Sequence, residues 1–430
     1  MSPTAFWNTA KNKTILMAAL AFAAGICAQT TVAQVPGVES SALEARQMMM
    51  QRENPERMEY RMPISAGDSA QPPLRMRPNG AAGPSFGLYP AVVRHAYGFD
   101  KLANQGAGQT IAIVDAYDDP NAEADLAVFS KQFGLASCTS SNGCFSKIYA
   151  TGQKPAMNAN WSMEIALDVE WAHAMAPQAK IVLVEAASNK MADLYRGVDV
   201  AVRSGASVVS ASWGCPEYSG ERGDDAHFAS TGVTFTAATG DNGSGVQFPS
   251  ASPDVVAVGG TTLAADANGN YQGETGWKGS GGGQSSVEFE PSFQAGFALP
   301  NDAKGRRGVP DVAFDADPST GFAIYDSVAY QGWVGWYEVG GTSAGTPQWV
   351  ALFAIANSSR VAVRKRLLSA TPGILYGLAK ANYGAYFHDE TNGSNGKCGT
   401  LCAAGTKYDY VTGLGTPRVD AIVGALVSQP

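Results

Sequence analysis

The sequence predicts an α/β fold in which one parallel β-sheet is flanked by helices within a single large domain. Five short apolar runs indicate this fold: QTIAIVD, KIVLVEA, SVVSAS, VTFTAA and DVVAVGG. Helical patterns or glycine-rich turns separate the runs, and such runs are typical of strands buried on both faces of a parallel sheet. Glycine occupies 49 of the 430 positions and gathers at the ends of these runs. That placement favours a groove in which another backbone approaches closely.

The first 33 residues have the pattern of a secretory signal. Lys11 and Lys13 precede the apolar run ILMAALAFAAGICA, and TVAQ then offers small residues for cleavage. The apolar run is too short to span a bilayer. We therefore expect a secreted protein, extracellular or, in a Gram-negative cell, periplasmic, without stable membrane association. Residues 34–84 are rich in Pro, Met, Arg, Gln and Glu, so we expect a disordered linker or short pro-segment before a domain over 85–430.

Composition narrows the classes of partner. The net charge is −8, and no run of Lys or Arg suggests a nucleic acid or an anionic membrane. Cys138 with Cys144, and Cys398 with Cys402, could close small surface loops in an oxidising compartment. Cys215 is left over, and we expect an inert buried thiol there. The sequence does not fix the oligomeric state, and a monomer is our expectation.

A hydroxyl group stands among small residues in GGTSAGTPQW, Gly340–Trp349. The run AGTPQWVALFAIANSSR that follows has apolar residues at helical spacing, and Pro347 is early enough for a first turn. Ser343 is therefore expected at the start of a buried helix, where it could simply be a cap. It could also be a nucleophile, because a helix N-terminus offers N–H groups and partial positive charge to an oxyanion. This stretch alone leaves both interpretations open.

A nucleophilic serine needs a base, and the usual base is histidine. The sequence has four histidines, and none stands in a context such as HGTH or HExxH. A histidine-based triad is therefore not expected. SMEIALDVEWAHAMAP has instead the pattern of a helix, with Ser162 as its cap and Pro177 as its stop.

Two carboxyl groups share one face of that helix, because Glu164 and Asp168 are four residues apart. Glu164 in a first turn would be favoured by the helix dipole, whereas Asp168, beside Trp171 and Met175, has no such explanation. Two carboxyl groups on a semi-apolar face cannot both ionise readily, so one pKa should rise and the pair can hold and pass a proton. On this pattern alone, a solvated helix face explains the two residues equally well.

A third acid, Asp241, follows a buried strand within the glycine turn AATGDNGSG. An aspartate in such a turn is usually structural and caps its own loop. The functional alternative is a protonated carboxyl group that donates a hydrogen bond to a developing oxyanion. That role requires a pKa above the working pH.

Together these features resemble the sedolisin family, the serine-carboxyl peptidases, which keep a subtilisin-like fold but use Ser-Glu-Asp in place of Ser-His-Asp. The resemblance runs from about Leu88 to the C-terminus, through E-x-x-x-D, SASWG, GD, RGVPDVAFDADPSTG and GTSAGTP. It implies a serine-type endopeptidase that cleaves proteins and peptides at acidic pH. The implied roles are nucleophile for Ser343, general base and later acid for Glu164, orientation and proton sharing for Asp168, and oxyanion-hole acid for Asp241.

The resemblance also implies one Ca²⁺ ion bound near the C-terminus. Its ligands fall in FHDETNGSNG and CAAGTKYDYVTGLGTP, on the carboxylates of Asp389 and Asp409 and the carbonyls of Glu390, Gly405 and Lys407. Hard oxygen ligands from loops suit Ca²⁺. Lys407 stands where the family usually has glycine, and the backbone angle needed there is costly for a residue with a Cβ. An acidic Asn/Gly turn without metal is the alternative.

The sequence also departs from the family pattern elsewhere, and two other functions compete with the peptidase interpretation. TGDNG stands where SGDSG is usual, and the long folded propeptide of the family has no counterpart, which argues against autoactivation by a prodomain. Asp115 ends the run QTIAIVD. It either extends the proton network, as an acid there does in some relatives that also have a tryptophan at the position of Trp213, or it caps its loop. The rival functions are a catalytically silent binding protein of the same fold, opposed by four intact catalytic residues, and an esterase or other serine hydrolase.

Overall fold

The computed structural model describes residues 60–61, 68–80, 83–266, 268–297, 299–300 and 305–430. All of them belong to one compact unit, which spans Met50–Pro430. The expected signal sequence, residues 1–33, lies outside the described residues.

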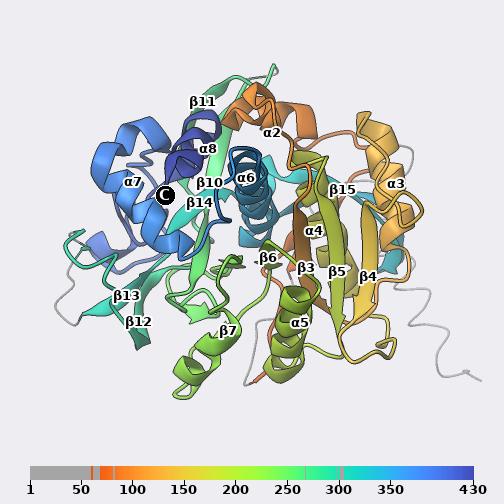
Figure 1. The fold of residues 1–430 in the computed structure, drawn as a ribbon, viewed down its shortest axis with the longest axis horizontal. Coiled ribbons are helices and arrows are strands. Elements are labelled where there is room, and N and C mark those ends of the chain that lie inside the picture. Colours follow the sequence, from red (N-terminus) through yellow and green to blue (C-terminus); the bar gives the residue numbers. More distant parts are fainter. Residues whose placement is uncertain (1–59, 62–67, 81–82, 267, 298, 301–304) are drawn as a thin grey trace, which may run out of the picture. The chain divides into compact units, whose positions relative to one another are not determined.

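A central, mainly parallel sheet organises the described part of the chain, as the apolar runs predicted (Figure 1). Its strands lie in the order β11-β10-β8-β6-β3-β5-β4, and β14 pairs with β10. Within this sheet only β11 is antiparallel to its neighbour. The strands are β3 (Thr110–Ala116), β4 (Phe145–Tyr149), β5 (Lys180–Ala186), β6 (Val208–Ala211), β8 (Thr234–Ala238), β10 (Val255–Ala265), β11 (Tyr271–Gly276) and β14 (Val312–Asp315). Each of the five apolar runs forms one of them, so this prediction is confirmed.

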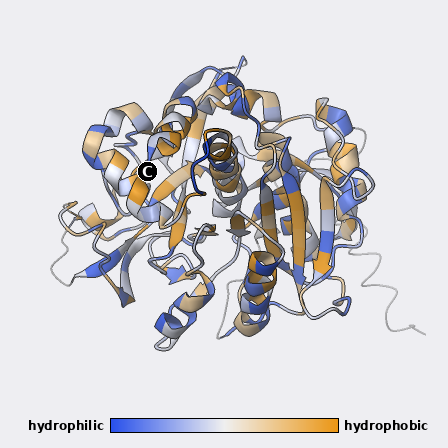
Figure 2. Ribbon diagram, in the orientation of Figure 1, coloured by the Kyte–Doolittle hydropathy of each residue, from blue (hydrophilic) through white to orange (hydrophobic). Residues whose placement is uncertain are grey.

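Both faces of the sheet are covered, because alternate residues of a strand point to opposite sides. Along β3, Ile111 and Ile113 belong to one hydrophobic core, whereas Ala112 and Val114 belong to a second. The apolar colouring of the central strands follows from burial on both faces (Figure 2). Residues of α5 (Met191–Arg203) fill the second core. The first core is filled from α2 (Pro90–Tyr97), α3 (Ala122–Phe133), α4 (Ala159–Met175), α6 (Thr342–Ala362), α7 (Thr371–Tyr386) and α8 (Val419–Ser428).

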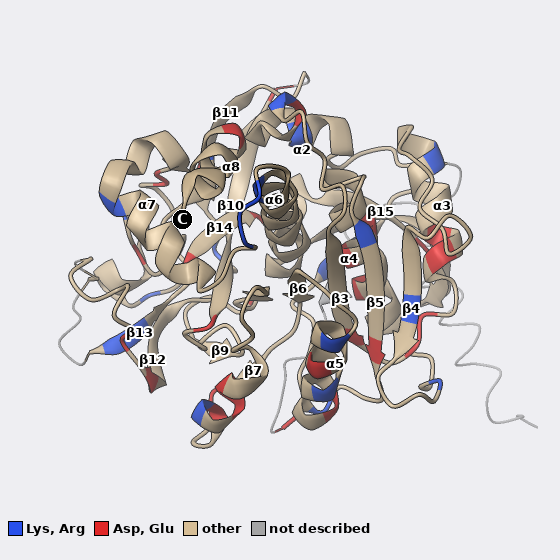
Figure 3. Cartoon of the chain, in the orientation of Figure 1, with Lys and Arg blue, Asp and Glu red and all other residues tan. Residues whose placement is uncertain are grey.

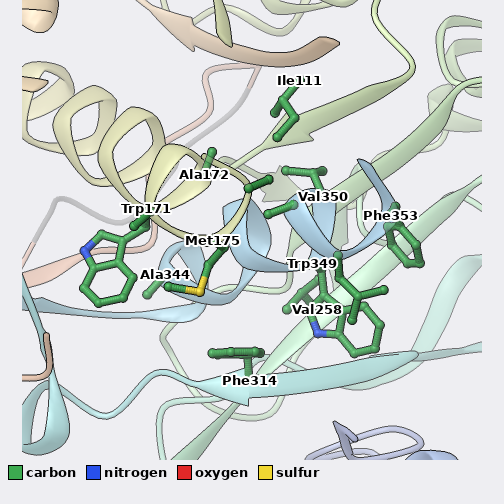
Figure 4. Packing of buried hydrophobic residues seen from close by; sticks show 14 of the residues in the cluster. Ile111, Trp171, Ala172, Met175, Val258, Phe314, Ala344, Trp349, Val350 and Phe353 are labelled. Carbon is green, nitrogen blue, oxygen red and sulfur yellow. The ribbon is translucent and has the colours of Figure 1, made fainter. Parts of the chain in front are cut away.

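Helix α6 runs through the first core and packs against β10 and β14 (Figure 4). Gly345 allows the close approach, because a Cβ there would lie 2.8 Å from Phe314 Cβ and 2.9 Å from Val258 Cγ1. Trp349 Nε1 donates to the carbonyl of Ala313 on β14. The start of α6, which carries Ser343, is therefore fixed against the sheet.

Smaller sheets surround this core. The largest is antiparallel and has the order β1-β2-β16-β15. Its strands are β1 (Tyr60–Arg61), β2 (Arg75–Pro78), β15 (Phe322–Tyr330) and β16 (Trp333–Gly340). The two-stranded pairs are β7 (Cys215–Pro216) with β9 (Gln247–Phe248), β12 (Gly283–Phe289) with β13 (Arg306–Val309), and β17 (Phe387–His388) with β18 (Thr416–Pro417). Strand β16 ends at Gly340, directly before the Ser343 turn.

The start of α4 corrects one expectation. The cap is Asn158, whose side chain accepts hydrogen bonds from the N–H groups of Asn160 and Trp161. Ser162 therefore lies inside the helix, where its Oγ donates to Asp326 Oδ1 at 3.1 Å. Because the helix begins earlier than expected, Glu164 lies in its second turn. The helix dipole at the N-terminus therefore gives a weaker explanation of Glu164 than the sequence suggested.

The expectation of disorder over 34–84 is wrong for residues 68–80. Ala70, Leu74 and Met76 are buried, although their segment is rich in proline and arginine. Strand β2 pairs with β16, with Arg75 opposite Gly340. Residues 34–59 and 62–67 lie outside the described residues.

The cysteines pair as expected. Disulfides join Cys138 to Cys144 and Cys398 to Cys402. Cys215 is free and buried, and burial raises the pKa of its thiol to about 12, so the thiol stays protonated. Among the described residues, no helix has the length and apolar character needed to cross a bilayer.

The cap of α4 can be tested by substitution. Asn158→Ala should lower the free energy of unfolding by about 1 kcal/mol, because it removes the acceptor for two N–H groups of the first turn. Asn158→Asp keeps an acceptor and is the matched control. Urea denaturation at pH 6, in a Ser343→Ala background that prevents self-digestion, measures both. An unchanged stability in Asn158→Ala would contradict this assignment of the cap.

Candidate active site

The turn between β16 and α6 leaves room for Ser343 to meet other groups. Gly341 has φ 128°, which favours glycine. A Cβ on Gly341 would lie 2.6 Å from Asp241 Oδ2 and 2.2 Å from the carbonyl oxygen of Pro73. Helix α6 begins at Thr342, so Ser343 lies in its first turn, as the sequence predicted. Its side chain is fully buried.

Glu164 and Asp168 lie on α4, which packs against α6. Both are fully buried, so the alternative of a solvated helix face is excluded. Burial raises the pKa of Glu164 well above its ordinary value, and the negative charges of Asp168 and Asp115 raise it further. The neighbouring Ser343 hydroxyl lowers the pKa of Glu164 and so opposes the shift.

The contact between Ser343 and Glu164 is not a fully formed hydrogen bond. Ser343 Oγ and both carboxyl oxygens of Glu164 have no partner of good geometry in the described part of the chain. Such contacts are often loose without substrate and tighten in the substrate complex. The two groups can therefore exchange a proton after a small adjustment.

Asp168 is held by a residue that the sequence analysis did not assign. Ser212 Oγ donates to Asp168 Oδ1 at 2.9 Å and also lies 3.5 Å from the backbone oxygen of Ser343. Burial raises the pKa of Asp168 well above its ordinary value, and the Ser212 hydrogen bond opposes this shift. Ser212 follows directly after β6, in the SASWG motif, and its position at a strand end was the available signal.

Asp115 does not cap a loop. It lies on β3, is fully buried, and neither of its carboxyl oxygens has a hydrogen-bond partner among the described residues. Burial raises its pKa, and the charges of Asp168 and Glu185 raise it further. Trp213 Nε1 donates to the carbonyl of Val114, the preceding residue. Of the two interpretations, the structure favours an extension of the buried carboxyl network.

Asp241 is tied to the residue before the candidate nucleophile. Its Oδ1 accepts from the backbone N–H of Thr342 at 2.8 Å and from Thr342 Oγ1 at 3.2 Å. Thr342 Oγ1 also accepts from the N–H of Gly240 at 3.0 Å. Arg75 Nη2 donates to the backbone oxygen of Asp241 at 2.7 Å. Asp241 therefore links two turns and does more than cap its own loop. No local sequence pattern pointed to Thr342 or Arg75.

The C-terminal loops bring the candidate calcium ligands together. Asp389 Oδ1 accepts from the N–H of Lys407 at 2.8 Å, and Asp409 Oδ2 accepts from the N–H of Gly405 at 3.0 Å. Tyr383 Oη donates to the carbonyl of Lys407. Lys407 has φ 64°, the left-handed conformation that the comparison with glycine suggested. The candidate ligands are the carboxylates of Asp389 and Asp409 and the carbonyls of Glu390, Gly405 and Lys407. All of these are oxygen ligands, which suit Ca²⁺ in kind.

More buried acids surround α4 and the neighbouring strand ends (Figure 3). Burial is the largest cause of each shift. The pKa values of Asp119 and Asp125 are raised to about 6, and those of Glu185 and Asp326 to about 8. Lys147 pairs with Glu185 at 3.1 Å but does not cancel the effect of burial on the pKa. Between pH ~4 and their raised pKa values, these four acids therefore retain protons that they would release in an unfolded chain.

Comparison with known proteins gives concordant matches. Residues 148–366 match the model of the subtilase family, a peptidase family. The chain is 35% identical over 376 residues to kumamolisin of Bacillus sp. (strain MN-32), covering 79% of the chain and 63% of the relative. It is 29% identical over 357 residues to sedolisin of Pseudomonas sp. (strain 101), covering 73% and 57%. The chain thus spans less than two thirds of the length of these relatives.

A solved structure matches over most of the chain. Pseudomonas sedolisin, described as a serine-carboxyl proteinase and solved with two molecules of pseudo-iodotyrostatin, superposes with a TM-score of 0.68. The sequence identity is 27%, and the match covers 81% of this chain and 99% of that chain.

The buried acids predict that the protein is more stable in acid than at neutral pH. Their folded pKa values lie above the ordinary values of about 4, so their contribution is complete below pH ~4 and is lost as the pH rises towards 8. Urea midpoints of Ser343→Ala, measured from pH 3 to 8, should therefore fall above pH ~4.

Asp326→Asn is the matched variant for this prediction. It removes one titrating group, so it should reduce the slope of stability against pH by up to about 1.4 kcal/mol per pH unit between the ordinary and the raised pKa of Asp326. A stability that increases from pH 4 to 7 would contradict this account of the acids.

Proposed function

Because the chain belongs to the sedolisin family of serine-carboxyl peptidases, which have a subtilisin-like fold, we propose that it hydrolyses peptide bonds in proteins and peptides through an acyl-enzyme on Ser343. One observation carries the proposal. A buried hydroxyl at a helix N-terminus lies beside a buried carboxyl pair, Glu164 and Asp168, whose pKa values are both raised. Such a pair can accept and return a proton in acid, where histidine would be charged and unable to act as a base.

The first step forms the acyl-enzyme. Ser343 Oγ attacks the peptide carbonyl carbon while Glu164 takes the hydroxyl proton, and Asp168 shares that proton with Glu164. The backbone N–H of Ser343 and a protonated Asp241 donate hydrogen bonds to the oxyanion. Asp241 is suitably placed for this role, because the N–H of Thr342 donates to it and glycine at position 341 leaves room for its Oδ2 beside the nucleophile turn.

The second half of the reaction returns the proton. Glu164 protonates the leaving amine as the C–N bond breaks, and the new N-terminus departs. Glu164 then removes a proton from water, which attacks the ester carbon and releases Ser343. Ser212 keeps Asp168 in place throughout, through its 2.9 Å hydrogen bond.

The pH dependence follows from these proton requirements. Activity should increase as Glu164 loses its proton, and the raised pKa of Glu164 puts this limb above the ordinary glutamate value. The role proposed for Asp241 requires its protonated carboxyl group, which low pH favours. We therefore propose a bell-shaped profile on the acid side of neutral pH.

We also propose that the protein works outside the cytoplasm. The two disulfide bonds suit an oxidising compartment, and the apolar run near the N-terminus suits export. One Ca²⁺ ion, held by the carboxylates of Asp389 and Asp409 and by loop carbonyls, would stabilise the C-terminal loops. No catalytic step depends on it.

Substitution at the site tests the proposed chemistry. Ser343→Ala should lower the rate at least a thousandfold, because it removes the nucleophile, and Glu164→Gln should do nearly the same. Cleavage of an acid-unfolded protein from pH 3 to 7, followed by mass spectrometry of the fragments, measures both effects.

The matched controls are Ser359→Ala, in the same helix α6, and Glu170→Gln, a buried acid of α4 that accepts from the N–H of Tyr325. Both should keep most of the activity. Loss of activity in Glu170→Gln equal to that in Glu164→Gln would mean that any buried acid of α4 is required, which contradicts the assigned roles.

The proposed calcium site predicts a change in thermal stability. Millimolar Ca²⁺ should raise the Tm of Ser343→Ala by several degrees, and Asp409→Asn should abolish the rise. Lys407→Gly should stabilise the chain by about 1 kcal/mol even without Ca²⁺, because it relieves a left-handed backbone. Arg364→Gly is the control, because Arg364 also has a positive φ but lies outside the proposed calcium site. Equal Tm values with Ca²⁺ and with a chelator would exclude the metal.

A further inference from the structure

A short hairpin near the C-terminus is closed by a disulfide bond. We call residues 393–404 the disulfide hairpin, after the bond between Cys398 and Cys402 at its tip. Its two arms pair with each other, and the N–H of Asn395 donates to the carbonyl of Cys402 at 3.0 Å. A further backbone hydrogen bond, also of 3.0 Å, closes the base of the hairpin. Hydrogen bonds and a covalent link therefore fix the position of Asn395.

The hairpin contacts the turn that carries Asp241. We call residues 239–245 the Asp241 turn. The carbonyl of Asn395 accepts from the N–H of Ser244 at 2.8 Å. Gly243 has φ 75°, and a Cβ there would lie 2.4 Å from the carbonyl oxygen of Asn395, so this close approach requires glycine. The hairpin backbone therefore supports the turn within three residues of Asp241.

The side chain of Asn395 joins the hairpin to a glycine-rich loop. Asn395 is buried, and its Nδ2 donates to the carbonyl oxygens of Ser280 at 2.9 Å and Tyr410 at 3.3 Å. The loop that carries Ser280 also contacts the Asp241 turn, because the N–H of Gly281 donates to the carbonyl of Gly240 at 2.8 Å. One amide group thus fixes the hairpin against this loop, and both elements hold the turn.

The position of the turn decides where Asp241 lies relative to Ser343. Asp241 Oδ1 accepts from the N–H of Thr342, the residue before Ser343, at 2.8 Å. A group that donates to an oxyanion must lie about 3 Å from it, and a misplacement of about 1 Å can reduce a rate about a hundredfold. An element that fixes the turn can therefore control the rate without contact with the substrate.

We propose that Asn395 is a positioning residue that holds Asp241 in place for stabilisation of the oxyanion, and that the Cys398–Cys402 disulfide keeps Asn395 in position. The proposal rests on the proposed peptidase function. Because Asn395 acts through the backbone of the Asp241 turn, its loss should lower kcat much more than it changes KM.

The first test compares Asn395→Ala with wild type, both as the full chain, on a peptide substrate at pH 4. Asn395→Ala should lower kcat about tenfold or more and change KM less than about twofold. Millimolar Ca²⁺ is present throughout, so that a weaker calcium site does not affect the comparison. Asn392→Ala, which truncates an exposed side chain at the base of the hairpin, is the matched control and should behave as wild type. Equal kcat values for Asn395→Ala and wild type would overturn the proposal.

Asn395→Asp gives a pH signature that a loss of packing would not produce. A protonated aspartic acid can donate where Nδ2 donates, whereas an ionised carboxylate would face two carbonyl oxygens. Asn395→Asp should therefore recover most of the wild-type kcat at pH 3, and its kcat relative to wild type should fall as the pH rises. An Asn395→Asp variant as slow as Asn395→Ala at pH 3 would contradict the role of the amide donor.

The disulfide has a matched control within the same chain. Cys398→Ser/Cys402→Ser should lower kcat about tenfold, because the hairpin tip is no longer closed. Cys138→Ser/Cys144→Ser removes the other disulfide, which has no part in the contacts of the Asp241 turn, and should keep the wild-type kcat. Equal kcat values for the two double variants would overturn the role of the Cys398–Cys402 bond.

Hydrogen exchange separates failure of this proposal from failure of the peptidase function, because it needs no activity. In Ser343→Ala the N–H of Ser244 should be protected by Asn395, and adding Asn395→Ala should speed its exchange at least tenfold. The amide of Val209 in β6 should not change. Equal exchange of Ser244 with and without Asn395→Ala would overturn the inference, whatever the activity. Faster exchange of Ser244 in that variant, without hydrolysis by wild type, would support the contact and contradict only the peptidase function.

Discussion

Burial of carboxyl groups beside one hydroxyl group is the constraint on which the rest of the site depends. Asp115, Glu164 and Asp168 are fully buried, and each has a raised pKa because burial disfavours its charged form. Such a cluster cannot ionise completely at low cost, so it retains protons that can move within it. Ser343 lies at the edge of this cluster, where one of those carboxyl groups can act as its base.

The parallel sheet brings these groups together, because its strands end along one edge. Asp115 lies near the end of β3, Ser212 follows β6, and Asp241 follows β8. Helix α4 adds Glu164 and Asp168 from one side, and the start of α6 adds Ser343. Packing of α4 and α6 on the same sheet face excludes water from the carboxyl groups. The raised pKa values therefore follow from the fold, because these two helices and the sheet bury the carboxyl groups between them.

Local sequence signals predicted the features that depend on neighbours along the chain. The apolar runs gave the strands, and the spacing of Glu164 and Asp168 gave their shared helix face. The same signals misplaced the cap of α4, because Ser162 and Asn158 are both good caps and only the hydrogen bonds decide between them. Composition suggested disorder over residues 34–84, but residues 75–78 of that segment form β2, which pairs with the distant strand β16. The contacts of Ser212, Thr342 and Arg75 likewise join distant segments, so no local pattern predicts them.

The central claim is that Ser343 carries the acyl group and Glu164 moves its proton, and trapping the acyl-enzyme tests this most directly. The chain would be mixed with a peptide ester, quenched in acid within milliseconds to seconds, and mapped by mass spectrometry. The account predicts an acyl group on the fragment that contains Ser343, and at least a hundredfold slower formation in Glu164→Gln. An acyl group on another residue, or equal formation in Glu164→Gln, would contradict it.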